Sequence, residues 1–465
     1  MKKIILIALI VLVPFLVSFM TKNPPGTNYL GTQHYGEDVE FLYDLTYVKE
    51  GERIHEHRIF DAQMELIQRA KEFILLDIFL YNDEYTKGEM EYPSQVREMT
   101  DLLIQKKKEN PQMPIILITD PLNNFYGAYE QENLKRLKEG GIEVVVTDLN
   151  KLRDSNPLIS GFYRAYAQWF GTNGIGWIPN FFDKNGPKVN VRSIIKLANF
   201  KGNHRKVYVT ENAAIVSSSN PHDPSSLHSN VAVKFYGPSM EDLIKSELIL
   251  VENPPELISN WKSEEVEDGD VKITVITEKA IFNSLKNHIA KSDKGDKIWL
   301  GIFYISDFDI LKELGEATKR GVEVKIVADL NKDAFGLEKN GSPNRPALSE
   351  LIEKYPELEV RWYNTTGEQF HTKMAYFDFL DKDPVAILGS ANFTRRNLRD
   401  LNLETNLELE IKKSTPIHEE IENYFQRIWN NEDGDYTMGI EEYYETSPVL
   451  RIVWKIQERF GLCTW

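Results

Sequence analysis

Residues 203–211 read Asn-His-Arg-Lys-Val-Tyr-Val-Thr-Glu, and residues 370–378 read Phe-His-Thr-Lys-Met-Ala-Tyr-Phe-Asp. Each stretch places a lysine two positions after a histidine, and an acidic residue follows after four more positions. Because side chains two apart on a strand share a face, we expect the histidine and lysine of each copy to project together. An apolar run and a Ser-x-Asn sequence follow each copy, and the next strand can bring these residues back beside the histidine. The Ser-x-Asn residues are Ser218 and Asn220 in the first copy and Ser390 and Asn392 in the second.

The segments around each copy also repeat. In both halves of the chain a helical pattern is followed by a buried apolar strand, then by a second helix and a second strand. The predicted helices are 60–71, 94–108, 130–139, 281–290 and 310–320, and the predicted strands are 73–80, 115–118, 142–146, 297–304 and 322–328. Alternation of this kind predicts an α/β fold, and the repeat predicts two similar halves.

The chain divides at composition changes. A stretch rich in acid, proline and glycine at 253–270 marks the join between the halves. We therefore predict a first half at 27–255 and a second half at 256–430. A terminal segment at 431–465 combines an acidic linker with an amphipathic helix, and residues 1–26 form an anchor and spacer.

The N-terminus has the composition of a membrane signal. Lys2 and Lys3 precede an apolar run from Ile4 to Met20. At about 1.5 Å per residue this run approaches the thickness of a bilayer core, and no small-x-small cleavage site follows it. A retained transmembrane helix is favoured over a cleaved signal peptide. The predicted location is the cell membrane, single-pass, with the N-terminus cytoplasmic and the body outside, or secreted if the segment is cleaved.

Charge and cysteine content exclude several classes of protein. The 465 residues include 55 basic and 71 acidic side chains, for a net charge of −16, which argues against non-specific binding to nucleic acid or to an anionic membrane. The single cysteine, Cys463, excludes a disulfide framework and a multi-cysteine zinc site. No metal site and no cofactor are predicted.

One imidazole, one ammonium and one carboxamide from each half suit a phosphodiester. Lysine binds phosphoryl oxygens, and imidazole titrates near neutrality, so one histidine can attack phosphorus while the other protonates the leaving oxygen. The phosphohistidine would then be released by water or by another alcohol. A single His-x-Lys is by default a pair of solvated strand residues, but two matching copies favour catalysis.

At these residues the chain resembles the phospholipase D superfamily, whose mark is a duplicated His-x-Lys-x4-Asp motif followed by Gly-Ser-x-Asn. The resemblance covers about residues 40–430. It implies a mixed sheet flanked by helices in each half, with the halves related by a pseudo-two-fold axis and one site at their junction. It also implies His204 as the nucleophile, His371 as the acid and base, and the lysines and asparagines as phosphate ligands. The implied catalytic residues are His204, Lys206, Glu211, His371, Lys373 and Asp378, and the implied substrate-binding residues are Ser218, Asn220, Ser390 and Asn392.

The first copy departs from this pattern at two positions. Glu211 stands where the family has aspartate, and Ser217 stands where it has glycine. Glu211 keeps the carboxylate and is expected to orient its loop. Ser217 adds a Cβ, so the turn before Ser218 is expected to differ from its counterpart.

The substrate is the remaining question, because the superfamily includes lipases, phosphatidyl transferases such as cardiolipin synthases, and nucleases. The anchor and the aromatic residues within 162–182 favour phospholipid over nucleic acid. A C-terminal helix carries an apolar row and a separate basic row; it can lie on a membrane, although docking on the body is preferred for so short a segment. The apolar row is Val449, Ile452, Val453, Ile456 and Phe460, and the basic row is Arg451, Lys455 and Arg459.

The sequence therefore predicts a membrane-anchored phosphodiesterase or phosphatidyltransferase that acts on phospholipids without a metal. A nuclease of the same superfamily and a non-catalytic phospholipid-binding protein are the alternatives. The oligomeric state is left open.

Overall fold

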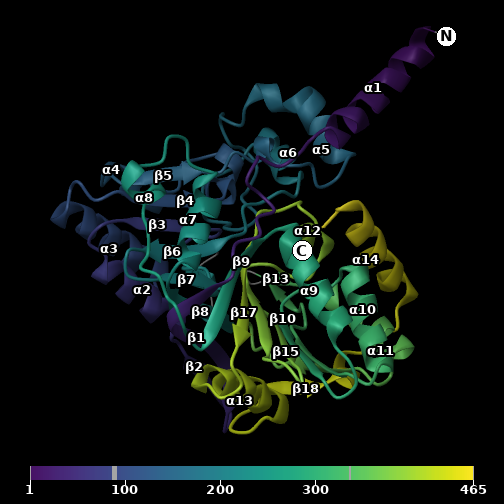
Figure 1. Ribbon diagram of the computed structural model, residues 1–465. Coiled ribbons are helices and arrows are strands. Elements are labelled where there is room, and N and C mark those ends of the chain that lie inside the picture. Colours follow the sequence, from purple (N-terminus) through teal and green to yellow (C-terminus); the bar gives the residue numbers. More distant parts are fainter. Residues whose placement is uncertain (1, 86–91, 335–336, 464–465) are drawn as a thin grey trace.

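The computed structural model describes residues 2–85, 92–334 and 337–463, and Figure 1 shows its elements. Met1 of the predicted anchor and residues 464 and 465 of the predicted tail lie outside the described residues.

One continuous mixed sheet runs through the molecule. Its strand order is β18-β14-β11-β10-β15-β16-β17-β9-β1-β8-β7-β6-β3-β4-β5, with β2 paired to β1 off this path. The first-half strands are β1 (His34–Lys49), β2 (Glu52–Glu56), β3 (Ile74–Ile78), β4 (Ile115–Thr119), β5 (Glu143–Val146), β6 (Lys206–Thr210), β7 (Ala214–Ser217) and β8 (Asn230–Tyr236). The second-half strands are β9 (Val271–Thr277), β10 (Lys297–Ile302), β11 (Glu323–Ala328), β14 (Glu359–Tyr363), β15 (Lys373–Asp378), β16 (Val385–Gly389), β17 (Thr405–Ile411) and β18 (Thr437–Gly439). A separate hairpin pairs β12 (Asp333–Ala334) with β13 (Leu337–Glu338).

The two halves repeat the same strand arrangement. In the first half β3, β4 and β5 are parallel, while β6, β7 and β8 return antiparallel beside β3. In the second half β10, β11 and β14 are parallel, while β15, β16 and β17 return in the same way beside β10. The predicted duplicated α/β architecture with mixed sheets is thus confirmed.

Helices cover the sheet and explain the burial of its parallel strands. Every residue of β3 and of β4 is buried, as expected for parallel strands covered on both faces. The helices of the first half are α2 (Ile59–Arg69), α3 (Gln95–Glu109), α4 (Glu132–Glu139), α5 (Ile159–Phe162), α6 (Val191–Leu197) and α7 (Ser239–Leu248). Those that follow are α8 (Glu256–Ser259), α9 (Lys279–Lys291), α10 (Phe308–Lys319), α11 (Asn344–Lys354), α12 (Arg395–Leu398), α13 (Pro416–Asn430) and α14 (Pro448–Phe460).

The halves are joined through a shared core. At the join β1 pairs with β9, from His34 opposite Ile273 to Gly36 opposite Val271. One hydrophobic cluster contains residues of β1 and β8, of β9 and β17, and of the helices α7 and α13. Two further clusters lie within the second and the first half. Because the central cluster draws on both halves, the sheet is one structural unit at the join.

The N-terminal segment contacts both halves. Before the chain enters β1, it forms two backbone hydrogen bonds with β9 of the second half. Thr277 N–H donates to the Tyr29 carbonyl, and Gly31 N–H donates to the Val275 carbonyl. Further back, the Asn23 amide donates to the carbonyl oxygen of Asp400, 3.0 Å away. Between residues 23 and 31 the chain therefore runs against the second half, and it then crosses the join to start β1 of the first half.

Helix α1 (Lys2–Phe19) differs from the predicted anchor. Pro14 and Ser18 are buried, and the last turns of α1 pack against α5. Figure 1 shows α1 projecting from the body beside α5 and α6. Within 2–85, 92–334 and 337–463, no helix has both the length and the apolar character needed to cross a bilayer. The prediction of a membrane-spanning anchor is therefore not supported.

Helix α14 docks on the body, but its apolar row faces outward. Trp454 and Glu458 are its buried residues, and the helix packs against α11 and α12. The basic row faces the body, because Arg451 pairs with Glu353 at 2.7 Å and Lys455 pairs with Glu350 at 2.7 Å.

The turn that ends β7 differs from the turn that ends β16, as the sequence predicts. Gly389 has a φ of +152°, and a Cβ at this position would lie 2.4 Å from the Thr405 carbonyl oxygen. Ser217, its counterpart, is not among the residues with positive φ, and its Oγ accepts from Ser219 N–H at 2.8 Å. The serine is therefore accommodated by an ordinary backbone and a local hydrogen bond.

We predict that Gly389→Ser destabilises the protein by about 3 kcal/mol, because it combines an unfavourable φ with a backbone clash. The matched exchange Ser217→Gly removes only a local hydrogen bond and some rigidity, at a cost of about 1 kcal/mol. Chemical denaturation of both variants measures the difference. Equal losses would show that the two turns are interchangeable.

Candidate active site

His204 and His371 lie at the junction, and the backbone of each is held by the opposite half. His204 N–H donates to the Leu403 carbonyl at 2.9 Å, while His371 N–H donates to the Ser229 carbonyl at 2.8 Å. Both side chains line the same pocket. The structure thus brings together two histidines that are 167 positions apart in the sequence (371 − 204).

Two buried aspartates at strand ends fix the loops that carry the histidines. Asp120, just after β4, accepts from Asn203 N–H at 2.8 Å, and Asp329, just after β11, accepts from Phe370 N–H at 2.7 Å. Burial raises the pKa of Asp120 to about 7 and that of Asp329 to about 6. Neither aspartate is among the site residues predicted from the sequence.

The two imidazoles have different partners across the junction. His204 Nδ1 lies 3.0 Å from Glu404 Oε2, and His371 Nδ1 lies 3.1 Å from Asn230 Oδ1. Because both partner atoms are acceptors, each histidine carries its proton on Nδ1 and turns Nε2 away from the partner. Asn406 pairs with Gly389 at the end of β16, and Ala232 pairs with Ser217 at the end of β7. Glu404 and Asn230 each lie two residues before these paired residues, so they occupy equivalent places.

Glu404 is itself held by a buried ionic network. Its N–H donates to Glu278 Oε1 at 3.1 Å, and the same carboxylate binds Arg205 Nη2 at 2.8 Å. Arg205 also pairs with Glu247 at 3.1 Å, and all of these side chains are fully buried. Although burial alone raises it, His204 and Lys206 hold the pKa of Glu404 below its ordinary value. Glu404 is therefore a fixed carboxylate, and sequence spacing alone did not reveal it.

The two lysines lie beneath the histidines. Lys206 Nζ donates to the His204 carbonyl at 2.7 Å, and Lys373 Nζ donates to the His371 carbonyl at 2.8 Å. Each ammonium also lies over an aromatic ring, Phe79 for Lys206 and Phe303 for Lys373. Neither lysine is exposed.

Burial suppresses positive charge in this cluster. It lowers the pKa of His204 to about 4 and that of Lys206 to about 7. Burial and neighbouring cations also hold the pKa values of His371 and Lys373 well below their ordinary values. An anion in the pocket would reverse these shifts by supplying the missing negative charge.

The remaining predicted residues divide into two groups. Asn220 and Asn392 line the pocket, in keeping with their predicted place beside the histidines. Ser218 and Ser390 do not line it: their hydroxyls donate to Asn230 at 3.1 Å and to Glu404 at 2.5 Å. The two serines thus hydrogen-bond the partners of the histidines, and they are not among the residues that line the pocket.

Glu211 and Asp378 are not part of the pocket. They lie at the far ends of β6 and β15 from the histidines, seven residues away at about 3.3 Å each. Glu211 accepts from Lys71 N–H at 2.7 Å, and Asp378 pairs with Lys297 at 3.1 Å. The structure does not bring these two carboxylates to the histidines, and each secures the end of its strand.

The pocket has a volume of about 440 Å³ and a largely apolar wall above the polar floor. Lys201, Lys339 and Arg396 add cations to its rim. The apolar lining residues are Phe79, Leu80, Leu122, Tyr126, Phe181, Phe182, Leu197, Phe200, Phe303 and Tyr304. Among the described residues, no group of three or more His, Cys, Asp or Glu side chains is arranged to hold a metal ion.

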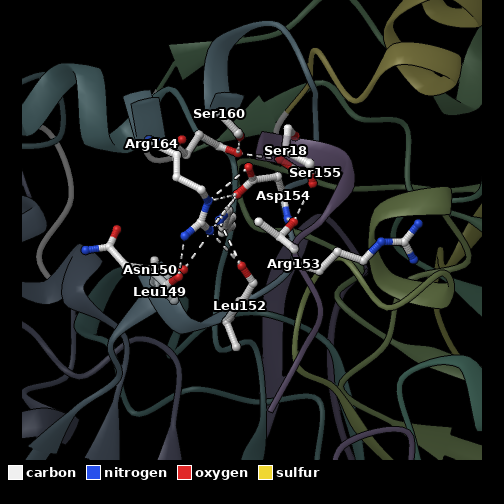
Figure 2. A network of polar contacts seen from close by, with 12 residues as sticks. Ser18, Leu149, Asn150, Leu152, Arg153, Asp154, Ser155, Ser160 and Arg164 are labelled. Atoms are coloured by element: carbon white, nitrogen blue, oxygen red, sulfur yellow. Dashed lines mark hydrogen bonds and ion pairs between the residues drawn. The ribbon is translucent and has the colours of Figure 1, made fainter. Parts of the chain in front are cut away.

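A buried aspartate secures one wall of the pocket. Figure 2 shows Asp154 receiving hydrogen bonds from Arg164, which also binds the carbonyl oxygens of Asn150 and Leu152. Lys201 pairs with the same carboxylate, and burial lowers its pKa to about 8. The network therefore connects Lys201, which lines the pocket, to Arg164, near the start of the aromatic-rich segment 162–182.

The comparisons agree with this geometry. The family described as cardiolipin synthase, PLD-like domain, matches residues 285–429. Over these residues the chain is similar to a phospholipase D-like family. The match includes the second histidine motif, and the repeated strand order extends the arrangement to the first half. No curated protein matches the chain.

The chain is also similar to solved structures. Phosphatidylserine synthase of Haemophilus influenzae is 13% identical with a TM-score of 0.59, covering 96% of this chain and 98% of that one. NucT of Helicobacter pylori is 19% identical with a TM-score of 0.28, covering 36% and 99%. Polyphosphate kinase of Porphyromonas gingivalis is 12% identical with a TM-score of 0.43, covering 90% and 53%. The first of these structures shares its fold with nearly the whole of this chain.

We predict that sulfate binds this pocket with uptake of protons, because the anion raises the lowered pKa values of Lys206 and the histidines. Sulfate stays a dianion from pH 5 to 9, so its affinity should fall as pH rises through 7, by up to about tenfold per pH unit for each proton taken up. Calorimetry in two buffers of different ionisation heat counts these protons. Binding without proton uptake would contradict the lowered pKa values of Lys206 and the histidines.

Proposed function

We propose that the protein is a phospholipase D-type phosphodiesterase or phosphatidyltransferase that acts on phospholipids. The observation that carries the proposal is an apolar-walled pocket lined by two histidines and two asparagines, with a buried lysine hydrogen-bonded to the backbone of each histidine. The floor suits a phosphodiester, and the wall suits the hydrocarbon that a phospholipid carries next to it. The family match over residues 285–429 supports the same class of reaction.

The different partners of the histidines indicate their roles. When His204 Nε2 attacks phosphorus, the ring becomes positively charged, and the Glu404 carboxylate at Nδ1 stabilises that charge. Asn230 accepts a hydrogen bond from His371 but carries no charge, so it stabilises the His371 imidazolium less than a carboxylate would. The imidazolium therefore gives up its proton more readily. His204 is therefore the nucleophile, and His371 is the acid.

The reaction then proceeds in two displacements. His204 Nε2 forms a bond to phosphorus as the bond to the leaving alcohol oxygen breaks, and His371 delivers a proton to that oxygen. In the second step His371, now neutral, takes a proton from water or from an acceptor alcohol, whose oxygen attacks phosphorus and releases His204. Lys206, Lys373 and the two asparagines would hold the phosphoryl oxygens throughout.

Exposed aromatic side chains beside the pocket support a lipid substrate. Phe181 both lines the pocket and is half exposed, and the same segment exposes Trp169, Phe170 and Trp177. Large apolar side chains gathered at the mouth of a site are typical of surfaces that meet lipid or protein. With a net charge of −16, the body as a whole would repel nucleic acid.

The first test uses the full-length protein with phospholipid vesicles in chelator. We expect phosphatidic acid as the product, and a phosphatidylalcohol when a primary alcohol is added. His204→Asn and His371→Asn should each lower turnover by about 10³-fold or more. Cleavage of DNA or RNA in place of lipid would favour the nuclease, and lipid binding without product in the intact protein would favour a binding protein.

The second test assigns the histidines. With a p-nitrophenyl phosphodiester, whose leaving group needs little protonation, His371→Asn should still release a burst of nitrophenol and accumulate phosphorylated protein. His204→Asn should show no burst and no phosphorylated protein, as detected by intact mass at alkaline pH. The opposite result would exchange the two roles.

The third test concerns the histidine partners. Glu404→Gln keeps the hydrogen bond and removes the charge, so kcat should fall by about 10–100-fold while KM changes little. Asn230→Ala, the matched change beside His371, should shift the acidic limb of the kcat profile, because it alters only the proton donor. If Glu404→Gln were indistinguishable from wild type in both kcat and the burst, the carboxylate would have no part in the attack.

A further inference from the structure

A second pocket lies on the other side of α12 from the catalytic one. Arg396 lines the catalytic pocket, whereas its neighbours Arg395 and Arg399 line the second, which has a volume of about 490 Å³. We call it the α12–α14 pocket. Its lining residues are Arg153, Lys279, Asp307, Phe308, Asp309, Arg395, Arg399, Asp400, Glu458 and Arg459.

The acidic residues of this pocket are already engaged. Arg399 binds Asp307 at 2.9 Å and Asp309 at 2.7 Å. Asp400 accepts from the backbone of Lys279 at 3.1 Å, and Glu458 accepts from the backbone of Arg395 at 2.6 Å. Burial also raises the pKa of Glu458 to about 7, which reduces its negative charge.

Four cations are left without a carboxylate. In the described part of the chain, no ion pair involves Arg153, Lys279, Arg395 or Arg459. Arg395 Nη1 is buried and has no hydrogen-bond partner among those residues. Buried donors are normally satisfied, so an unmet guanidinium nitrogen on a residue that lines this pocket points to an anionic ligand. This concentration of unpaired positive charge occurs in a protein whose net charge is −16.

The apolar row of α14 leads to the edge of this pocket. Val449, Ile452, Ile456 and Phe460 are 66%, 59%, 47% and 54% exposed, and Phe460 follows Arg459 of the pocket directly. Figure 1 shows α14 on the outer side of the second half, next to α10 and α11. A ligand that carries a phosphate and a hydrocarbon would meet cations and apolar side chains in adjacent places.

We propose that the α12–α14 pocket binds the phosphate of an anionic phospholipid, separately from the catalytic pocket, while the apolar row of α14 contacts the hydrocarbon of the same surface. Arg395 and Arg459 would supply charge-assisted hydrogen bonds to the phosphoryl oxygens. The site gives an acidic protein a local means of holding an anionic membrane. It goes beyond the proposed reaction, because it requires no turnover.

The experiment compares vesicles of phosphatidylcholine with vesicles that also contain phosphatidic acid. All proteins carry His204→Asn, so that the catalytic pocket is constant and no lipid is consumed. We expect Arg395→Gln/Arg459→Gln to lose most of the preference for anionic vesicles, at least about tenfold in sedimentation. Arg459→Gln alone, at an exposed position, should lose part of it without affecting folding. The matched control Arg69→Gln/Lys135→Gln removes two charges from α2 and α4 and should bind like the parent.

Two further arms separate lipid from free phosphate. Ile452→Asn/Ile456→Asn should weaken binding to the same vesicles while leaving any thermal shift caused by glycerol 3-phosphate unchanged. With His204 intact, the arginine double variant should cleave a soluble short-chain substrate at the normal rate, so failure of the proposed reaction is scored independently. Unchanged vesicle binding in both double variants, or arginine-dependent binding of glycerol 3-phosphate with no vesicle preference, would overturn the proposal.

Discussion

The structure depends on a pair of backbone hydrogen bonds that cross the junction. Each catalytic histidine is anchored by a carbonyl of the opposite half, Leu403 for His204 and Ser229 for His371. The next residue in the chain, Glu404 or Asn230, then supplies the partner of the imidazole. Position, tautomer and charge of each histidine are therefore set by the half to which it does not belong. Neither half could form the site by itself.

On this symmetric frame the residues have diverged. A carboxylate serves one histidine and a carboxamide serves the other. Arg205, buried among acids behind the first histidine, has Thr372 as its counterpart behind the second. These exchanges occur where a charge changes the chemistry, while the lysines, the aromatic rings beneath them and the aspartates at the strand ends are kept in both halves. A duplicated scaffold can in this way support two different steps of one reaction.

Much of the fold could be predicted from the sequence, because the apolar strands and the His-x-Lys spacing are local patterns. The central residues of the site followed, since a strand places His204 and Lys206 on one face. What failed were roles that depend on distance in space. Glu211 and Asp378 belong to the motif but lie a strand's length from the histidines. Glu404 lies outside the motif and meets His204 only through the fold, and the outward direction of the α14 apolar row depends on its ion pairs with the body.

The course of the N-terminal segment has a consequence for taking the protein apart. Because the chain runs along β9 before it enters β1, the N-terminal segment of the first half is hydrogen-bonded to the second half. A cut in the acidic stretch between the halves would break the covalent link. It would leave the N-terminal segment, the pairing of β1 with β9 and the shared core in place. Two such fragments should copurify and complement each other. The covalent join, which looks like a linker in the sequence, therefore contributes less to holding the halves together than the non-covalent contacts do.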